Sequence, residues 1–356
     1  MSNKLKIFFG VLGLGLIIAS VAFVFSLHDL KTKSDSHKLT SKVQVSPTPL
    51  PTPTPKPVTM IFGGDMMFDR HIRQKAEVAG GYDFILAPLE NVLTSVDLVV
   101  ANLEGPITNN QSISVNSIVG GPRNYTFTFD PAVVKTLARF NLKLVNLGNN
   151  HILNFGQDGL VQTLNYLDKG GIDWFGYTGG KLKTQNLKLK TGGQEAKTQN
   201  YIDQVGWVDQ RTIRGQKFLF VNFNQFINQE LEPLTEFIRQ KRNQVDWIIV
   251  MPHWDNEYQT TPAPITRQKA HRLVEAGADL IVGAHPHVVA ETERYQGKRI
   301  YYSLGNFVFD QYFEPAVRKG LLVKVEFSSN RIVEYNEIYT WLNTNGQTEL
   351  LGDRED

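Results

Sequence analysis

Gly283-Ala284-His285-Pro286-His287-Val288 follows directly on the apolar run Ala278-Asp279-Leu280-Ile281-Val282. A buried strand over 279–283 would deliver two histidines, one residue apart, to its carboxyl end, where loops converge. Neutral imidazoles presented together in such a place are suited to binding a divalent metal ion. The sequence therefore predicts a strand that ends in a metal site.

Ligand-type residues also end four other apolar runs. These residues are Asp65, Glu104, the pair Asn150-His151, and His253. Taken singly, each has an ordinary structural explanation: Asp65 and Glu104 as turn or helix-capping residues, and His253 as a buried structural histidine. Five such clusters at the ends of five separate runs favour one shared site instead.

The residue types suggest a division of work within that site. Gly63 and Gly64 let the backbone approach a ligand closely, and the carboxylate of Asp65 is a natural metal ligand. Glu104 could bridge two metal ions, or it could cap a turn. Asn150 offers a carbonyl oxygen to a metal, and His151 a proton to a leaving group. Arg70 could pair with an anionic substrate oxygen or form a surface salt bridge, whereas His71 and His271 are expected to be structural or exposed.

Ile7 to Leu27 is a run of 21 residues without a charge, long enough to cross a bilayer as a helix. We expect a retained anchor that contacts the lipid bilayer, with residues 1–27 as tail and anchor. The alternative is a cleaved signal peptide, with Ser20-Val21-Ala22 as a small-residue cleavage site. The chain has no cysteine, which excludes a lipid-modified lipoprotein. Because a very short N-terminal tail usually stays inside, we expect a single-pass protein with its bulk outside the cell membrane.

Residues 28–57 are expected to be a Ser/Thr/Pro-rich linker. Proline alternates with other residues from Pro47 to Pro57, which favours an extended spacer; a Pro-x-x-Pro docking site is the alternative. Up to Pro57 the chain holds 7 Lys and 2 acidic residues, so 30 Lys and Arg face 33 Asp and Glu beyond it, a net charge of −3. A mildly acidic globular part argues against nucleic acid as its main partner.

Apolar periodicity predicts one domain over residues 58–345, followed by a polar C-terminal tail over 346–356. Strands are expected over 58–63, 97–101, 143–147, 217–223, 246–251 and 299–304, and helices over 156–169, 233–243 and 266–276. A hairpin turned at Ser329-Asn330 should close the domain. This order indicates an α/β sandwich rather than a barrel. The polar stretch from Lys181 to Thr212 is expected to form an exposed flap or hairpin near the site.

Six motifs resemble a known family in their order and spacing. They are Gly64-Asp65-Met66-Met67-Phe68-Asp69-Arg70, Ala101-Asn102-Leu103-Glu104, Asn149-Asn150-His151, Pro252-His253-Trp254, Gly283-Ala284-His285-Pro286-His287 and Tyr302-Ser303-Leu304-Gly305-Asn306-Phe307-Val308-Phe309-Asp310-Gln311. Over about 58–327 the chain resembles CapA-type capsule-synthesis proteins of the poly-γ-glutamate biosynthesis family. The domain of that family is similar to the calcineurin-like metallophosphoesterases.

The resemblance implies a metallophosphoesterase-like αββα sandwich, preceded by one transmembrane helix and the Pro-rich linker. It implies two divalent metal ions, of Mn, Zn, Fe or Mg. Asp65 and His287 would hold one ion, Asn150, His253 and His285 the other, and Glu104 would bridge them. His151 and Arg70 would be catalytic, and Asn102, Asn306 and Asp310 are expected to bind substrate.

Two functions agree with this resemblance. One is a metal-dependent phosphoesterase of capsule or poly-γ-glutamate biosynthesis, acting on a phosphoester at the cell envelope. The other is a non-catalytic, metal-stabilised factor that binds an anionic envelope polymer or helps its export, alongside other capsule-synthesis membrane proteins. One departure bears on the choice. Phosphoesterases of this fold usually carry Asp-x-His on the first strand, where this chain has Asp65-Met66-Met67. A thioether is a poor ligand for Mn or Mg, so the first metal is one ligand short.

Overall fold

The computed structural model describes residues 56–176, 208–329 and 331–352, all within the compact unit Thr54–Asp356. The predicted anchor and linker, apart from Lys56 and Pro57, lie outside the described residues, as does most of the predicted flap. Among the residues described, no helix has the length and apolar character needed to cross a membrane.

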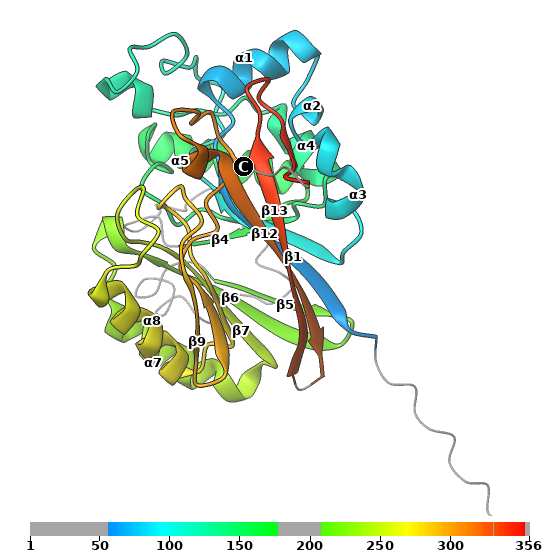
Figure 1. Cartoon of the computed structure of the whole chain (residues 1–356), viewed down its shortest axis with the longest axis vertical. Coiled ribbons are helices and arrows are strands. Elements are labelled where there is room, and N and C mark those ends of the chain that lie inside the picture. Colours follow the sequence, from blue (N-terminus) through cyan, green and yellow to red (C-terminus); the bar gives the residue numbers. More distant parts are fainter. Residues whose placement is uncertain (1–55, 177–207, 330, 353–356) are drawn as a thin grey trace, which may run out of the picture. The chain divides into compact units, whose positions relative to one another are not determined.

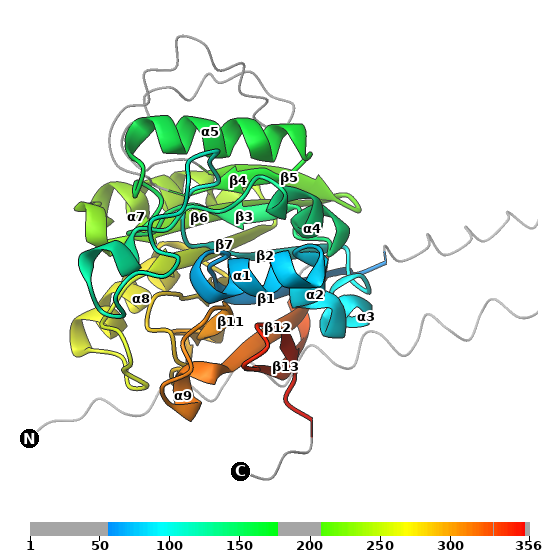
Figure 2. The same cartoon turned by 90° about the horizontal axis from the view of Figure 1, so that it is seen from above.

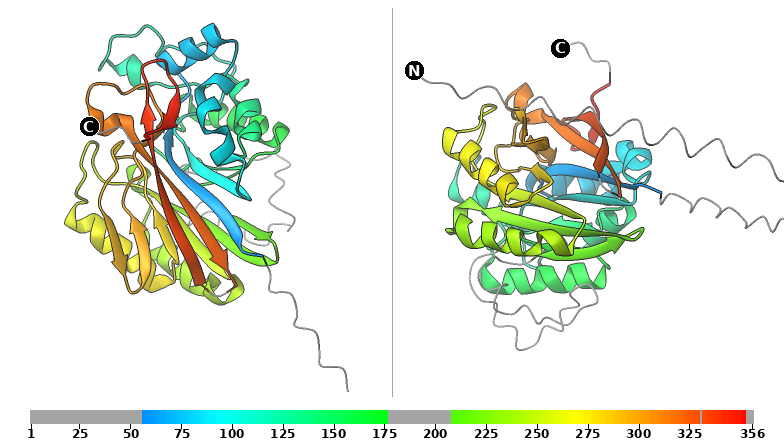
Figure 3. Two further views of the ribbon diagram at one scale, coloured as in Figure 1. Left: turned by 45° about the vertical axis from the view of Figure 1, so that its right-hand side comes forward. Right: turned by 90° about the horizontal axis from the view of Figure 1, so that it is seen from below.

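One sheet is built around the first strand of the domain. Its order is β14-β13-β12-β1-β2-β3-β4, and β11 pairs with the end of β1. Strands β1 to β4 run parallel, whereas β12 to β14 add antiparallel ribbons beside β1. The strands are β1 (Val58–Met66), β2 (Leu98–Leu103), β3 (Leu144–Asn146), β4 (Asp173–Phe175), β11 (Asn306–Val308), β12 (Lys319–Ser328), β13 (Arg331–Leu342) and β14 (Thr348–Leu350). Figure 3 shows the β12–β13 hairpin lying alongside β1, which is drawn in blue.

The second sheet has the order β5-β6-β7-β8-β10-β9. Its four central strands run parallel, and its two edge strands are antiparallel to their neighbours. The strands are β5 (Asp209–Ile213), β6 (Gln216–Asn224), β7 (Trp247–His253), β8 (Leu280–Val282), β9 (Thr292–Tyr295) and β10 (Lys298–Tyr301).

Helices cover the outer face of each sheet. In the first sheet's layer lie α1 (Arg70–Ala79), α2 (Asp83–Leu86), α3 (Glu90–Leu93), α4 (Val133–Arg139) and α5 (Gly156–Lys169). In the second sheet's layer α7 (Leu231–Lys241) and α8 (Pro264–Ala276) pack side by side (Figure 1). The single turn α9 (Pro315–Arg318) precedes β12. Figure 2 shows α1 and α5 on the first sheet's side of the molecule.

Successive side chains along each strand point into different layers, as the two-residue period of a strand requires. In β1, Phe62 belongs to the core between the two sheets, whereas its neighbour Ile61 packs under the helices. In β7, Ile249 points to the inter-sheet core, whereas Ile248 packs under α7 and α8. The molecule is therefore a four-layer α/β/β/α sandwich, which confirms the predicted α/β sandwich.

The predicted elements agree closely with those observed, with two corrections. Helix α5 coincides with the prediction, and α7 begins two residues early because proline is tolerated in a helix's first turn. The predicted polar tail is wrong for Thr348–Leu350, which form β14 against β13; Thr348 is buried and its hydroxyl donates to the Phe307 carbonyl. The predicted flap is wrong for its last residues, which form strand β5. Both are short edge strands, too short to give a periodic signal.

Candidate metal centre

The residues predicted to form one site come together where parallel strands of both sheets end. Asp65 lies near the end of β1, in register with Asn102 of β2 on one side and Asn306 of β11 on the other. Glu104 follows β2, and His253 is the last residue of β7. Carboxyl ends of parallel strands are where α/β proteins commonly place their ligands.

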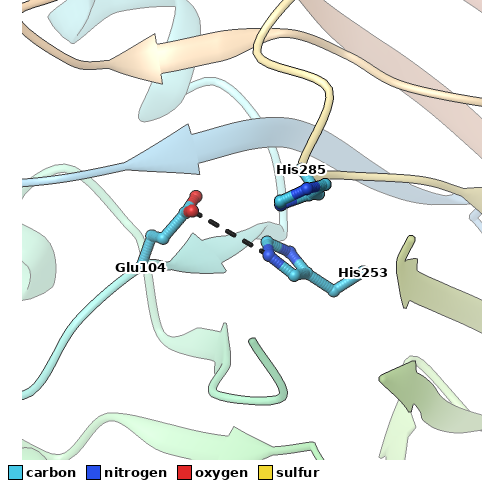
Figure 4. Close-up of side chains that lie close together, drawn as sticks. All are labelled: Glu104, His253 and His285. Carbon is cyan, nitrogen blue, oxygen red and sulfur yellow. Dashed lines mark ion pairs between the residues drawn. The ribbon is translucent and has the colours of Figure 1, made fainter. Parts of the chain in front are cut away.

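Glu104 faces His253, and His285 lies close to both (Figure 4). The Oε1 atom of Glu104 is 3.7 Å from His287 Nε2 and 3.9 Å from His253 Nε2. The side chain is fully buried, and Oε1 has no hydrogen-bond partner among the residues that the structure describes. Ligand atoms about 2.0–2.2 Å from one ion lie roughly 3–4 Å from each other. The spacing around Oε1 therefore fits a cation, which would also satisfy this buried oxygen.

Two groups of ligand atoms share Glu104. Asp65, Glu104 and His287 form one, and Glu104, His253 and His285 form the other, with the donor atoms of each within 4.8 Å of one another. Asn150 lies beside the second group, since its Oδ1 is 2.8 Å from His253 Nε2. The resemblance implies the same two sets of residues, and their assignment to two ions stays a prediction.

The loop between β8 and β9 holds its two histidines in an unusual backbone conformation. His285 has φ 99° and His287 has φ 60°, a region that non-glycine residues adopt rarely and at a cost. The backbone N–H of His285 donates to Asp65 Oδ2 at 3.0 Å, which ties the loop to β1. His285 Nδ1 is buried without a hydrogen-bond partner among the described residues. This strain and this unpaired atom both point to a ligand.

Asn306 fixes the orientation of His287. Its amide nitrogen donates to the Val317 carbonyl at 2.9 Å, so its oxygen is the atom that lies 2.9 Å from His287 Nδ1 and accepts from it. His287 Nε2, the atom facing Glu104, is then the nitrogen with a lone pair for a metal. Asn306 is buried and holds a ligand, so its contacts differ from the predicted substrate contact.

Asn102 also supports the ligand side chains from the protein interior. It is buried, and its Nδ2 donates to Asp65 Oδ1 at 2.7 Å and to Glu104 Oε2 at 3.2 Å. Asn149 continues this network, because its Nδ2 donates to Asn102 Oδ1 at 3.1 Å. Asn149 and Asn102, the latter expected to bind substrate, therefore both position the carboxylates.

The pKa values of the two buried carboxyl groups, Asp65 and Glu104, shift in opposite directions. Burial disfavours ionisation of Asp65, but its hydrogen bond with His287 outweighs burial, so the pKa of Asp65 lies well below its usual range. For Glu104, burial and then the negative charge of Asp65 raise the pKa well above its usual range. A cation beside Glu104 would replace the proton that the carboxyl otherwise holds.

His253 and His285 are neutral near pH 7, as metal binding requires. Burial lowers the pKa of His253 to about 3 and that of His285 to about 2. The chemistry of the donor atoms, the unpaired oxygen of Glu104 and the neutral imidazoles together fit divalent cations.

His151 stands at the edge of the centre and is partly exposed. Its ring packs at 4.5 Å on Phe127, and its Nδ1 lies 3.2 Å from Asn154 Oδ1. That oxygen also accepts from the backbone N–H of Phe127 at 2.8 Å, so Nδ1 is the donor and carries a proton. Burial lowers the pKa of His151 to about 4, against the opposing effect of the hydrogen bond to Asn154.

Arg70 and Asp310 form an ion pair next to the site. The Arg70 guanidinium also donates to Asn124 and lies 5.1 and 5.4 Å from the ring centres of Phe127 and Phe309. Phe127 and Phe309 in turn contact His151 and His287. One aromatic ring thus lies between Arg70 and each of these histidines. The Asp310 carboxylate pairs with the Arg70 guanidinium, which differs from the substrate contact predicted for it.

Three further residues lie away from the centre. Met67 is buried in the core under the helices, and its sulfur accepts from the backbone N–H of Asp69 at 3.0 Å. His71 faces the carbonyl of Thr344 at 3.1 Å, and His271 pairs with Glu293 at 2.7 Å. Both histidines have the structural contacts that the sequence predicted for them.

Glu257 is the residue that sequence reasoning missed. It is exposed, and its carboxylate lies within 4.8 Å of donor atoms of His285 and His287. It sits in an irregular loop four residues after His253, with no strand end or apolar run to mark it. Its proximity to the other ligands arises only when β7 and β8 lie side by side.

Fold and site together define a two-sheet α/β protein with a carboxylate–histidine centre suited to divalent metal ions. Residues 59–311 match the family described as "Bacterial capsule synthesis protein PGA_cap", and the chain belongs to this family. This confirms the resemblance noted from the six motifs.

Among relatives, the chain is 30% identical over 271 residues to the PGA biosynthesis protein CapA of Bacillus subtilis (strain 168), covering 76% of this chain and 67% of that protein. It is 28% identical over 257 residues to the capsule biosynthesis protein CapA of Bacillus anthracis, covering 71% and 60%. The chain thus spans about two thirds of the length of these relatives.

Two solved structures overlap it more loosely. One is described as a novel phosphatase of Mycoplasma pneumoniae, with a TM-score of 0.47, 15% identity and coverage of 80% of this chain and 93% of that one. The other is a putative 5'-nucleotidase from Staphylococcus aureus, with a TM-score of 0.44, 14% identity and coverage of 83% and 55%. At these scores neither structure carries an argument about this chain.

Proposed function

We propose that this chain is a divalent-metal-dependent phosphoesterase that takes part in the synthesis of an anionic capsule polymer such as poly-γ-glutamate. The observation that carries the proposal is the buried, unpaired Oε1 atom of Glu104, which two histidine-containing ligand groups share. The printed names of the Bacillus relatives refer to PGA and capsule biosynthesis, which supports the biological process.

The mixed donor set agrees with Mn, Zn, Fe or Mg, because imidazole suits the transition metals and carboxylate suits the harder ions. When bound, two such cations would stabilise charge on a phosphoryl group and lower the pKa of a bound water. Asp65, Glu104, Asn150, His253, His285 and His287 would hold them. Asn102 and Asn306 would keep the ligands in place through the hydrogen bonds described above.

His151 is the proposed acid for the leaving group. Without substrate its lowered pKa keeps the ring neutral at pH 7. A phosphate nearby would favour the charged form by placing an opposite charge beside the ring. Arg70 is held by Asp310 and Asn124 against the rings of Phe127 and Phe309. Its guanidinium would place a positive charge on the same side of the site.

The second candidate function is a non-catalytic accessory factor whose fold is stabilised by metal. Met67 favours it, because a thioether stands in the buried core where a histidine ligand is usual. A relative from Mycobacterium tuberculosis (strain ATCC 25618 / H37Rv), 29% identical over 234 residues, covers 63% of this chain and 58% of that protein. It is named a probable polyglutamine synthesis accessory protein.

His151→Ala separates the two functions. In the enzyme it should retain the metal and lose turnover by roughly 10²–10⁴-fold, the usual range for a general acid. The loss should be smaller for p-nitrophenyl phosphate, whose leaving group needs little protonation. His71→Ala is the matched control and should keep both metal and turnover. Were the parent loaded with Mn, Zn or Mg yet inactive on phosphomonoesters and diesters alike, the accessory role would replace the enzyme.

We also propose that Ile7–Leu27 anchors the chain in the cell membrane, with the domain outside and near other capsule-synthesis membrane proteins. Protease added to intact cells should then remove the domain and leave a small membrane fragment. Protection until lysis would mean the opposite orientation. Shortened protein in the medium would mean that the segment is a cleaved signal.

A further inference from the structure

The ligand group that contains His287 has fewer protein ligands than the group that contains His253. Asp65, Glu104 and His287 supply one donor each, whereas Glu104, His253 and His285 are joined by Asn150. Met67 does not make up the difference, because its side chain is in the apolar core with its sulfur on the Asp69 N–H. A further ligand must come from another part of the chain if both groups are to hold an ion equally well.

The loop after β7 supplies a carboxylate at this place. Its backbone runs beside the histidine loop: Ala284 N donates to the Pro252 carbonyl at 3.0 Å, and Tyr258 N donates to the Pro286 carbonyl at 2.8 Å. Glu257 precedes Tyr258 and so faces the His285–His287 pair from the solvent side. Its carboxylate and donor atoms of these histidines lie within 4.8 Å of one another.

The loop is held in this position before any ion binds. Asp255 and Tyr258 both have positive φ, 69° and 64°. Asp255 accepts from the backbone N–H groups of Asn256 and Ala263, each at 3.0 Å, which fixes one side of the loop. On the other side, the Tyr258 hydroxyl accepts from Gln311 at 3.2 Å. Such strain on both sides of one carboxylate is typical of a functional loop.

His285 gives an independent indication. It is 4% exposed, its Nδ1 has no hydrogen-bond partner among the described residues, and it belongs to both the Glu104–His253 group and the Glu257–His287 group. A buried imidazole nitrogen without a partner is costly unless a ligand satisfies it.

We propose that Glu257 is a metal ligand of this centre and supplies, from the rim, the further ligand that the group of Asp65, Glu104 and His287 lacks. The inference rests on the metal centre of the proposed function.

Mn(II) titration of the chelator-stripped full chain by calorimetry, with metal counted after dialysis, tests this assignment. Glu257→Gln should weaken one of the binding events by about tenfold or more, equal to about 1.4 kcal/mol. Glu314→Gln is the matched control, since Glu314 is exposed, carries the same charge and belongs to none of the ligand groups found among the described residues. Its isotherm should match the parent's.

Three outcomes decide against the assignment, and they are distinguishable. If Glu257→Gln and Glu314→Gln give the same isotherm, Glu257 is not a ligand and the proposed function is unaffected. If the parent binds no Mn(II), the metal centre itself fails. The ratio of parent to Glu257→Gln affinity should also persist in 0.5 M KCl. Salt screens long-range attraction between charges but leaves a direct metal–ligand bond largely intact. An affinity ratio that falls to one in salt would therefore mean that Glu257 only attracts Mn(II) from a distance.

Discussion

At the scale of single residues, Met67 has a different place in the structure from the one that the family resemblance implies. Sequence comparison with the phosphoesterase pattern marks it as a poor substitute for a metal-binding histidine. The side chain is instead fully buried with Phe68 and Ile72 in the core under the helices, and its sulfur accepts from the Asp69 N–H. Its role is therefore packing, and the ligand that a histidine would have provided has to come from elsewhere.

Met67→Leu tests this assignment. Leucine and methionine have similar volumes, so the free energy of unfolding of the metal-free chain should fall by less than about 1.5 kcal/mol. The Mn(II) affinity should stay within about twofold of the parent's, because no ligand is removed. Denaturant titration and calorimetry measure the two quantities. A large loss of metal affinity without loss of stability would show that the sulfur is a ligand after all.

The residues of the site were predictable where an apolar run ends in a chemically distinctive side chain. Asp65, Glu104, His253, His285 and His287 all have this signal, and the structure brings them together. Asn102 and Asn306 were found as members of the site, but their buried hydrogen bonds, which make them supports for other ligands, depend on neighbours far away in sequence. Glu257 carries no local signal at all, because its place depends on the pairing of two loops.

At the scale of elements, the close contact between β1 and β11 sets the position of Asp65. The backbone N–H of Asp65 donates to the Gly305 carbonyl at 3.0 Å, just before β11 begins. A Cβ atom at Gly64 would lie 1.8 Å from that same carbonyl oxygen. Periodicity predicted β1, but a three-residue strand such as β11 has no period, and the partners of β1 cannot be inferred from its own sequence.

Gly64→Ala should therefore separate the two strands. The collision is with backbone on both sides, so relaxation requires the strands to move apart. We expect a loss of more than about 2 kcal/mol of stability, as for other overpacked cores, and weaker metal binding. Gly121→Ala is the control, since its Cβ would meet atoms of Ile118, of which the carbonyl oxygen is nearest at 3.1 Å, in an ordinary backbone conformation. Equal thermal unfolding of the two variants would contradict the role given to this contact.

At the scale of the whole domain, the centre belongs to neither sheet alone. Asp65 lies in β1 of the first sheet and Glu104 follows β2 of that sheet, whereas His253 is the last residue of β7 in the second sheet. The ligands meet only because the shared core of Phe62, Val100, Phe220 and Ile249 holds the two sheets face to face. Bound cations would thus join the sheets, and they should stabilise the fold by mass action.

The most direct test of the central claim is the number of metal ions per chain, counted after equilibrium dialysis of the purified parent against Mn(II). We expect two ions for the parent, at most one for His253→Ala and for His285→Ala, and two for His271→Ala, whose histidine lies in α8 and pairs with Glu293. The parent should also gain about 2.7 kcal/mol of stability for each site at a free metal concentration 100 times the Kd of that site. No bound metal in the parent, or the same count in all four proteins, would contradict the metal centre.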